Sequence, residues 1–333
     1  MSTWLTLDEV EAISHRMLVN SGASALQAGP TARSIRDAEA EGVRNVGLAY
    51  LPTYCVHLEC GKVRGDAVPT VTTPRPAAVL VDAALGFCHP AYEAGESALV
   101  DAARTNAIAM LAVRHSYSAG VLGWFVDRLA RHGLVALMFA NSSALVAPHG
   151  GARPFFGTNP LAWAVPRPDG EPVVGDLSSS AVAWVRVKAA ADAGEAIPLG
   201  WALDADGHPT TDPHAALAGS MAPLGGHKGT ALALLVDLLA GGLTGSRFSH
   251  EAGSFGGDDP DSPDVGQLVI AIDPAATGGP DVLDRLAADL DAMTAEDGAR
   301  LPGDRRLAAR SAAARDGVEV PDDLMAELRR RSG

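Results

Sequence analysis

The sequence predicts an α/β fold, because apolar stretches of strand length alternate with polar loops and an amphipathic helix. Residues 108–113 form a continuous apolar run typical of a buried strand, and a helix with one apolar face follows over residues 121–129. Residues 134–140 are a second apolar run. Strand, polar loop, helix and strand in this order indicate an α/β layer, in which ligands gather at the strand ends.

A predicted hairpin lies in the middle of residues 141–180. Two short apolar runs, residues 161–165 and 173–174, flank the turn sequence Arg-Pro-Asp-Gly at residues 167–170. Glycines and small polar residues on both sides would let the backbone approach a ligand without obstruction by Cβ. Turn chemistry alone explains the same residues equally well, so a binding site and a purely structural loop both remain open here.

Length and composition predict a globular protein with two domains, because 333 residues exceed the usual size of one domain. A formal net charge of −14 argues against a nucleic-acid partner, whose phosphates would be repelled. No apolar run approaches the roughly 18 residues of a membrane helix, and we expect no secretory signal. Cys55, Cys60 and Cys88 lack metal-ligand spacing, which predicts reduced thiols, no metal and a cytoplasmic location.

Helices are predicted at both ends of the chain. Thr6 and Glu9 form a capping box before the first helix, and Ser24 and Gln27 repeat this device before the second. A third helix over about residues 48–58 completes a helical module. Further elements are predicted as strands at residues 79–81 and 267–273, a helix at residues 90–104, a flexible loop at residues 248–264, and helices beginning near Asp281, Gly303 and Asp322.

Residues 223–229 read Pro-Leu-Gly-Gly-His-Lys-Gly and open a predicted helix. Glycines before a helix start leave free amides at the positive end of the helix dipole, and Lys228 adds a charge, so an anion site is predicted. A glycine-rich linker with a chance lysine is the alternative. The spacing is not that of a P-loop, and no Gly-x-Gly-x-x-Gly follows a strand, so neither nucleotide fingerprint is present.

The ordered set of these segments resembles the malate/L-lactate dehydrogenase family that lacks a Rossmann fold. Relatives in that family include sulfolactate and ureidoglycolate dehydrogenases and the piperideine-2-carboxylate/pyrroline-2-carboxylate reductases. The resemblance extends roughly from residue 5 to residue 330. Its matching segments are residues 148–151, 157–160, 176–180, 197–202, 206–213 and 223–229.

The resemblance implies a mixed-sheet, non-Rossmann cofactor domain at residues 116–274. It also implies a helical domain for substrate and dimerisation built from both chain ends, residues 1–115 and 275–333. A homodimer, a small-molecule substrate and NAD or NADP as cofactor follow from it. Carried over by position, the cofactor-binding candidates are Asn141, Thr158, Asn159, Ser178, Ser180, Arg186, His227, Lys228 and Gly229. Arg186 stands where the family usually has lysine. Arginine is also positively charged, so the charge that would face a cofactor phosphate is retained.

The first catalytic pattern of the family is substituted in this chain. The pattern Asp-x-x-Gly-x-x-Ser-His-Gly-x-x-Arg falls on residues 39–50. Its Ser-His pair has become Asn45-Val46, and its arginine, which would hold a substrate carboxylate, has become Tyr50. The loss of that arginine removes a bidentate charged contact.

The second pattern, Arg-x-Ser-x-His-x-Gly, falls on residues 114–120, and its histidine, the family's proton donor or acceptor, has become Ser118. Asp176 keeps its place as a catalytic candidate. Replacement proton donors are His115, Tyr117 and Tyr50, with tyrosine hydroxyls being modest acids unless a cation is near. His149 is expected to pack near the cofactor. No chemical role is assigned to His15, His57 and His132, which fall within predicted helices.

These features predict an NAD(P)H-dependent oxidoreductase with an altered active site. A cyclic imine or an unusual carbonyl compound of a specialised pathway fits better than malate or lactate, because the arginine clamp is missing. An imine that is already protonated in solution also needs less from an enzymic acid, which suits the lost histidine. The alternatives are an enzyme on the same scaffold that catalyses a rearrangement or addition without hydride transfer, and a catalytically silent cofactor-binding homologue.

Overall fold

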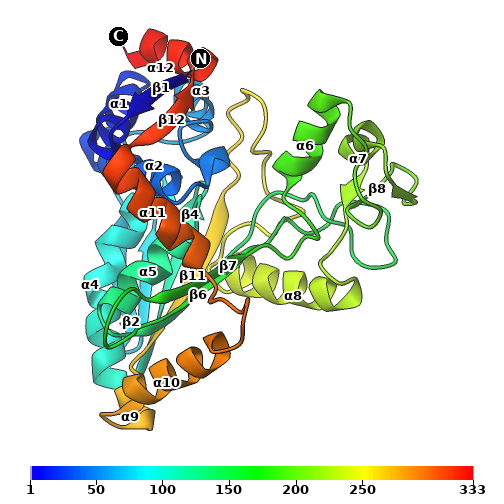
Figure 1. The fold of residues 1–333 in the computed structure, drawn as a ribbon. Helices are drawn as coiled ribbons and strands as arrows, with labels where there is room; N and C mark the ends of the chain where they lie inside the picture. Colours follow the sequence, from blue (N-terminus) through cyan, green and yellow to red (C-terminus); the bar gives the residue numbers. More distant parts are fainter. Residues whose placement is uncertain (1, 333) are drawn as a thin grey trace.

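A seven-stranded mixed sheet forms the centre of the protein, as the computed structural model of residues 2–332 shows (Figure 1). Its strands occur in the order β2, β3, β4, β11, β5, β6, β7. Strands β3 and β4 are parallel, whereas all other neighbours are antiparallel. The expected α/β fold with a mixed sheet is therefore confirmed. The strand bounds are β2 (Thr70–Arg75), β3 (Ala78–Asp82), β4 (Ile108–Ser116), β5 (Val135–Ala140), β6 (Leu161–Val165), β7 (Val173–Leu177) and β11 (Val265–Ile272).

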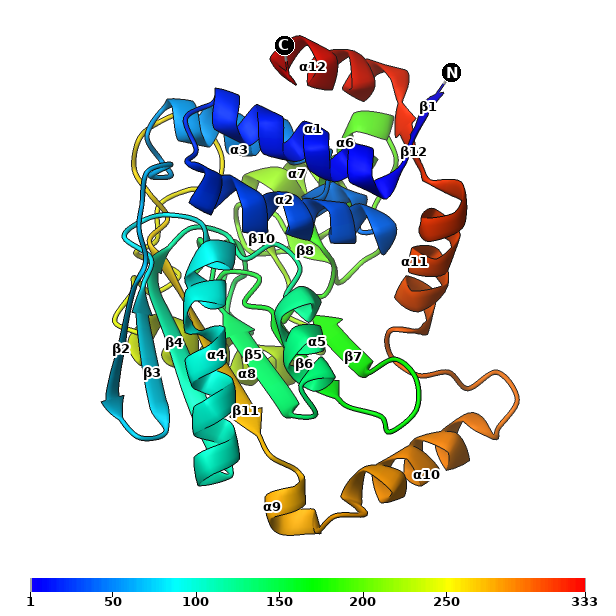
Figure 2. The same ribbon diagram turned by 90° about the vertical axis from the view of Figure 1, so that its left-hand side faces the viewer.

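Two helices cover one face of this sheet (Figure 2). Helix α4 (Cys88–Asn106) is the crossover between the parallel strands β3 and β4, and α5 (Gly123–Arg131) connects β4 to β5. Because side chains alternate along a strand, Leu111 and Val113 of β4 point to these helices and are fully buried. Ile108 and Met110 point to the opposite face, where they remain 50% and 44% exposed.

A helical layer is assembled from both ends of the chain. It contains α1 (Leu7–Asn20), α2 (Ala25–Ala40) and α3 (Leu51–Glu59), with α12 (Asp322–Ser332) packed against α1. Thr6 and Glu9 form the expected capping box of α1. Strand β1 (Ser2–Leu5) pairs antiparallel with β12 (Val318–Pro321), so the two termini lie together (Figure 1). Helix α11 (Asp304–Asp316) returns the chain to this layer after α9 (Ala275–Gly278) and α10 (Val282–Thr294).

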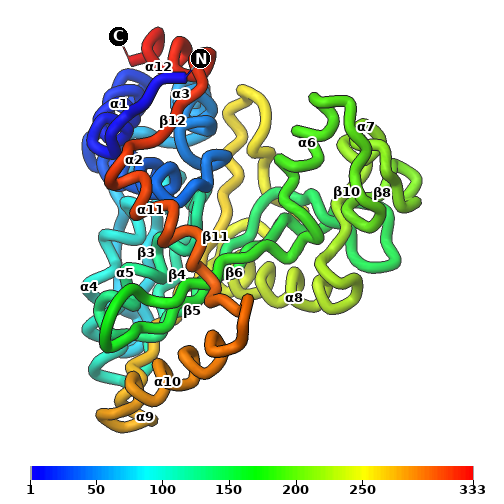
Figure 3. Tube along the Cα trace, viewed as in Figure 1, coloured from blue at the N-terminus to red at the C-terminus, as the bar shows by residue number. Residues whose placement is uncertain are grey.

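A smaller lobe lies beside the helical layer and the sheet (Figure 3). It contains α6 (Trp184–Ala193), α7 (Pro213–Ala218) and a three-stranded sheet of β8 (Ala202–Leu203), β9 (Pro209–Thr210) and β10 (Ser220–Met221). Helix α8 (His227–Asp237) runs beneath this lobe and continues into a π-helical turn (Leu238–Gly242). Residues 248–264 contain no helix or strand and pass between the lobe and the helical layer (Figure 3).

The expected division of the chain at residues 115 and 116 falls at the end of β4, inside the central sheet. Strands from both sides of that division pair in the sheet, because β4 and β5 both bond to β11. The split into two domains therefore does not coincide with an edge of the sheet. Within residues 2–332, no helix combines the length and the hydropathy needed to cross a membrane.

Candidate active site

The three segments predicted to line a cofactor site meet at the start of α8. The Ser179 amide and hydroxyl both donate to the Thr158 carbonyl oxygen, at 2.9 and 2.8 Å. The Leu224 amide donates to the Ser179 carbonyl at 2.8 Å, which pairs residues 178–181 with the glycine-rich segment before α8. Asn159 Nδ2 donates to the Ala233 carbonyl of α8 at 2.9 Å. Motifs distant in sequence thus form one continuous wall.

The predicted amide side chains Asn141 and Asn159 hold this wall together. Both are buried. Asn141 Oδ1 accepts from the Gly266 amide at 3.0 Å, and its Nδ2 donates to the Arg247 carbonyl at 2.8 Å. Asn159 Oδ1 accepts from the Ser249 hydroxyl at 3.0 Å. Because both amides are already satisfied within the protein, they position the backbone around the site.

The two predicted serines are also linked to each other. The hydroxyls of Ser178 and Ser180 are hydrogen-bonded, and Ser180 Oγ donates to the Val182 carbonyl at 2.7 Å. Ser180 is buried, whereas Ser178 is only partly buried. Ser178 is therefore the serine whose surroundings leave it more open to a ligand.

The start of α8 has the features of an anion site. Gly226 is its N-cap, with φ of +67°, and no side chain caps the first amides of the helix. Those amides lie at the positive end of the helix dipole. A Cβ at Gly229 would lie 2.2 Å from the Leu224 carbonyl oxygen, so only glycine fits there. His227 and Lys228 are exposed beside these amides. This donor set fits a phosphate of a dinucleotide.

Arg186 and His149 lie around the same lobe. Arg186 is exposed on α6, and its guanidinium carbon lies 5.2 Å from the centre of the Trp201 ring. The ring of His149 lies 6.2 Å from that of His227, at the start of α8. This places His149 beside the glycine-rich segment, and its expected packing near the cofactor stays a prediction.

Of the substituted positions 45, 50 and 118, the last two lie beside a cluster of aromatic side chains. Asn45 is exposed on a short 3-10 helix (Arg44–Val46), and Tyr50 is half-buried just beyond it. The Tyr50 ring meets Tyr54 edge to face, with centroids 4.9 Å apart. Ser118 is half-buried, and its hydroxyl accepts the Gly120 amide at 3.2 Å. Burial raises the pKa of Tyr54 well above its usual value.

Tyr117 is the buried centre of this cluster. Its hydroxyl lies 2.5 Å from His57 Nδ1, and its ring packs edge to face on Tyr54, Phe87 and Phe255. Burial raises the pKa of Tyr117 far above that of a free tyrosine. Tyr117 and His57 thus form a buried pair of polar groups, and Tyr50 contacts the cluster through the Tyr54 ring.

His57 reaches a second partner on the other side of its ring. His57 Nε2 lies 3.0 Å from the Gly257 carbonyl oxygen. A carbonyl oxygen only accepts hydrogen bonds, so Nε2 carries a hydrogen and, in the neutral ring, Nδ1 accepts from Tyr117. Burial and the neighbouring Lys62 charge lower the pKa of His57, while the Gly257 carbonyl and Asp259 oppose this shift.

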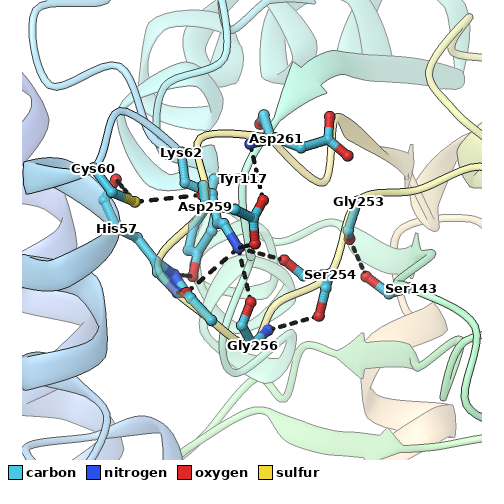
Figure 4. A network of polar contacts seen from close by, with 12 residues as sticks. His57, Cys60, Lys62, Tyr117, Ser143, Gly253, Ser254, Gly256, Asp259 and Asp261 are labelled. Atoms are coloured by element: carbon cyan, nitrogen blue, oxygen red, sulfur yellow. Dashed lines mark hydrogen bonds and ion pairs between the residues drawn. The ribbon is translucent and has the colours of Figure 1, made fainter.

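A loop joins the aromatic cluster to the cofactor wall (Figure 4). The Lys62 ammonium group is fully buried and donates to the carbonyls of Ser254 at 3.0 Å and Gly256 at 2.8 Å. It also pairs with Asp259 at 3.2 Å. At the other end of the loop, the hydroxyl of Ser143, two residues after Asn141, donates to the Gly253 carbonyl. Residues 253–259 therefore span from the cofactor wall to the helical layer.

The structure places His115 and Asp176 in other surroundings. His115 has φ of +49°, and its Nδ1 lies 3.1 Å from Asp82 Oδ2, a carboxylate that also accepts from Arg114. Asp176 Oδ2 accepts from the Gly123 amide at the start of α5, at 2.9 Å. Each side chain is thus engaged with a partner outside the aromatic cluster.

Comparison with known proteins agrees with this geometry. A family model described as malate/L-lactate dehydrogenase matches residues 5–329. The chain belongs to the malate/L-lactate dehydrogenase family. The family predicted from the order of the motifs is confirmed, and with it the enzyme class, an NAD(P)-dependent oxidoreductase.

Several members of the malate/L-lactate dehydrogenase family are similar over nearly the whole chain. A (2R)-3-sulfolactate dehydrogenase (NADP(+)) of Chromohalobacter salexigens is 43% identical, covering 99% of this chain and 98% of that protein. A Delta(1)-pyrroline-2-carboxylate reductase of Burkholderia ambifaria is 42% identical, covering 97% and 96%. The crystal structure of a delta1-piperideine-2-carboxylate reductase from Pseudomonas syringae superposes with a TM-score of 0.92 at 38% identity and covers 99% of both chains.

Two residues that hold the 253–259 loop against the helical layer had no predicted role. His57 was assigned no role, and Lys62 was not considered. Both reach residues 254–259, almost 200 positions further along the chain, and His57 also reaches Tyr117. No local pattern in the sequence signals such a contact, because it depends on how a loop far along the chain folds back.

Proposed function

We propose that this protein uses a reduced nicotinamide cofactor to reduce a cyclic imine in an active site altered from the family pattern. The observation that carries the proposal is the aromatic cluster at the position of the family's arginine clamp. Tyr50 replaces that arginine, and Tyr54, Tyr117 and Phe255 pack behind it. A planar, protonated imine is a cation, and aromatic faces attract cations. The names of the pyrroline and piperideine reductases, at 38–42% identity, support the same substrate class.

The chain's own residues would hold the cofactor at the start of α8. Lys228, His227 and the uncapped amides there would bind phosphate, and Ser178 faces the same wall. When bound, the cofactor supplies the hydride. The name of the sulfolactate relative specifies NADP, which favours NADP for this protein.

We further propose a homodimer in the cytoplasm. An apolar surface lies where the central sheet is not covered by α4 and α5, and it includes Ile108 and Met110 of β4. Leu234 and Leu235 on α8, and Leu238 at the start of the π-helical turn, are also 45–48% exposed. Exposed apolar surface of this kind is typical of protein interfaces. Sedimentation at micromolar concentration would test the dimer, and a monomer would contradict it.

The test of the function follows NADH and NADPH absorbance with pyrroline- and piperideine-carboxylates beside malate, lactate and pyruvate. We expect turnover of the imines and very poor turnover of malate and lactate. Tyr50 cannot form the bidentate charged pair that arginine makes. Ser118 cannot exchange a proton near neutral pH, and a positioned acid or base contributes about 10²–10⁴ in rate.

The outcomes of this assay separate the candidate functions. Efficient turnover of malate or lactate would contradict the altered site. No turnover of any substrate, together with intact NADH or NADPH binding in a calorimetric titration, would favour an enzyme without hydride transfer or a silent homologue.

A further inference from the structure

We propose that a hollow in the helical layer binds a small zwitterionic amino acid, with its ammonium group on Glu39 and its carboxylate on Arg44. The hollow measures about 230 Å³ and lies between the end of α2, helix α11 and the strand pair of β1 and β12 (Figure 2). Its lining comes from Trp4 and from residues 39–44 and 309–319, all outside the cofactor wall. The site therefore does not depend on the proposed reduction.

Glu39 is a buried carboxylate that has no ion-pair partner within residues 2–332. It is only 5% exposed and lines the hollow. Its Oε1 accepts the Leu48 amide at 2.7 Å, while Oε2 has no hydrogen-bond partner in the same described part of the chain. Burial raises the pKa of Glu39, and the Leu48 amide and the Arg44 charge offset this effect only in part. Buried charges are stable when they are paired, so an ammonium group in the hollow would stabilise this carboxylate.

Arg44 supplies the opposite charge to the same hollow. It is exposed at the start of the 3-10 helix and contributes to the lining. No carboxylate among residues 2–332 forms an ion pair with it, and its charge acts on Glu39. A guanidinium group matches a carboxylate with two parallel hydrogen bonds. One amino acid would therefore satisfy both side chains, because its carboxylate suits Arg44 and its ammonium group suits Glu39.

The other two charged groups of the lining already have partners. Asp316 pairs with Arg315 at 2.8 Å, and Glu319 accepts the Ser2 hydroxyl at 2.7 Å. The groups of the lining that remain uncommitted are thus one acid and one base. This balance favours a ligand that carries both charges over a simple cation.

The apolar part of the hollow suits a small hydrocarbon side chain. Trp4 lines it and is 58% exposed. Ala309, Ala312 and Ala313 lie on one face of α11 and contribute only methyl groups. The volume is below the roughly 300–1,000 Å³ of pockets for drug-sized ligands, so a ring such as that of proline fits better than a large side chain. Contact with such a ring would remove apolar surface of Trp4 from water.

The tryptophan indole signals in NMR spectra of the cofactor-free protein locate the ligand. The sequence has five tryptophans, and Trp4→Phe identifies the Trp4 signal. We expect proline to shift this signal until the site is saturated. Pyrrolidine and cyclopentanecarboxylate keep the five-membered ring but carry one charge each, so each should bind about tenfold more weakly or worse. An unshifted Trp4 signal would overturn the proposal, as would a shift confined to other tryptophans or equal binding of pyrrolidine.

Two substitutions test the two charges of the site. Glu39→Gln keeps an oxygen that accepts the Leu48 amide but removes the negative charge. Arg44→Gln removes the guanidinium group at an exposed position, where the fold does not depend on it. We expect each to weaken proline binding about tenfold or more. Arg104→Gln is the matched control, because Arg104 is exposed on α4 and donates to the His132 carbonyl. Wild-type affinity for proline in Glu39→Gln or in Arg44→Gln would overturn the proposal.

Discussion

Arg306 of α11 forms an ion pair with Asp176 of β7, with Nη1 3.3 Å from Oδ2. The same carboxylate oxygen accepts the Gly123 amide and so fixes the start of α5, a few residues after Ser118. An aspartate that was predicted from the family pattern as catalytic is thus tied to two structural partners. Its neighbours indicate that it positions the 118–123 segment.

Substitutions in this ion pair distinguish a structural role of Asp176 from a catalytic one. We expect Asp176→Asn and Arg306→Gln each to lower the free energy of unfolding by about 1–2 kcal/mol, because a charge-assisted contact is lost in both. Urea denaturation measures this change. Arg306→Gln is the control for steady-state rates, because it breaks the ion pair but keeps the Asp176 carboxylate. A 10²-fold or larger loss of kcat confined to Asp176→Asn would instead make Asp176 the proton-transfer group.

Lys228→Ala should weaken cofactor binding about tenfold or more, because a charge-assisted contact to phosphate contributes roughly 1.5–3 kcal/mol. Fluorescence titration with NADH and NADPH gives the dissociation constants. Lys188→Ala is the matched control, since Lys188 is an exposed lysine on α6 whose charge is paired with Asp192. Equal affinity in Lys228→Ala and the control would remove Lys228 from the cofactor site.

Lys62→Met should release the loop at residues 253–259. The substitution leaves the carbonyls of Ser254 and Gly256 without their buried donor, and the loss of a charged hydrogen bond costs about 1.5–3 kcal/mol of unfolding free energy. Limited proteolysis should then cut within the loop. Asp259→Asn should have little effect, because the Asp259 side chain is 54% exposed. Equal protease resistance of wild type and Lys62→Met would show that the loop is held by other contacts.

His89 should make the protein less stable in acid. The ring is buried against Trp124 and Phe125, and this burial lowers the pKa of His89 from 6.5 to about 3. The Ala119 carbonyl favours the charged ring. Neither ring nitrogen, however, makes a well-formed hydrogen bond, so burial dominates.

The sign of the His89 effect follows from where its proton binds. Between the folded and unfolded pKa values only the unfolded chain takes up the proton, so stability is full above 6.5 and falls toward pH 3. For each pH unit by which the pH falls within that window, the free energy of unfolding decreases by up to about 1.4 kcal/mol. Urea denaturation between about pH 4 and 7 should give a shallower pH dependence for His89→Leu than for wild type. The exposed His132→Gln is the control, and an unchanged slope in His89→Leu would contradict the assignment.

Several parts of the fold that follow from local patterns were predicted correctly, although the second capping box is only half present, since the Gln27 side chain bonds to Ala67 and Phe87 instead. The capping box at Thr6, the apolar runs of β4 and β5, and the hairpin of β6 and β7 are all present. Strand β2 was missed because all its residues are exposed and Pro74 interrupts it, so no alternating pattern marks it. The pairing of β1 with β12 joins the two chain ends, which no local pattern can indicate.

The candidate active site also has one part that local sequence patterns predicted and one part that they did not. Segments rich in glycine and serine, such as the one before α8, carry a local signal because backbone close to a ligand requires small residues. The aromatic cluster carries none. Its members come from α3, from the loop after β4 and from residues 255–257, and only the folded chain joins His57 to Tyr117.

Strand β11 occupies the middle of the central sheet although it is the last of the seven strands along the chain. During synthesis, β4 and β5 leave the ribosome long before their shared neighbour exists. Until residues 265–272 emerge, both strands present unpaired apolar edges of the kind that recruit other chains. The emerging polypeptide, rather than the finished enzyme, is therefore the form most in need of chaperones.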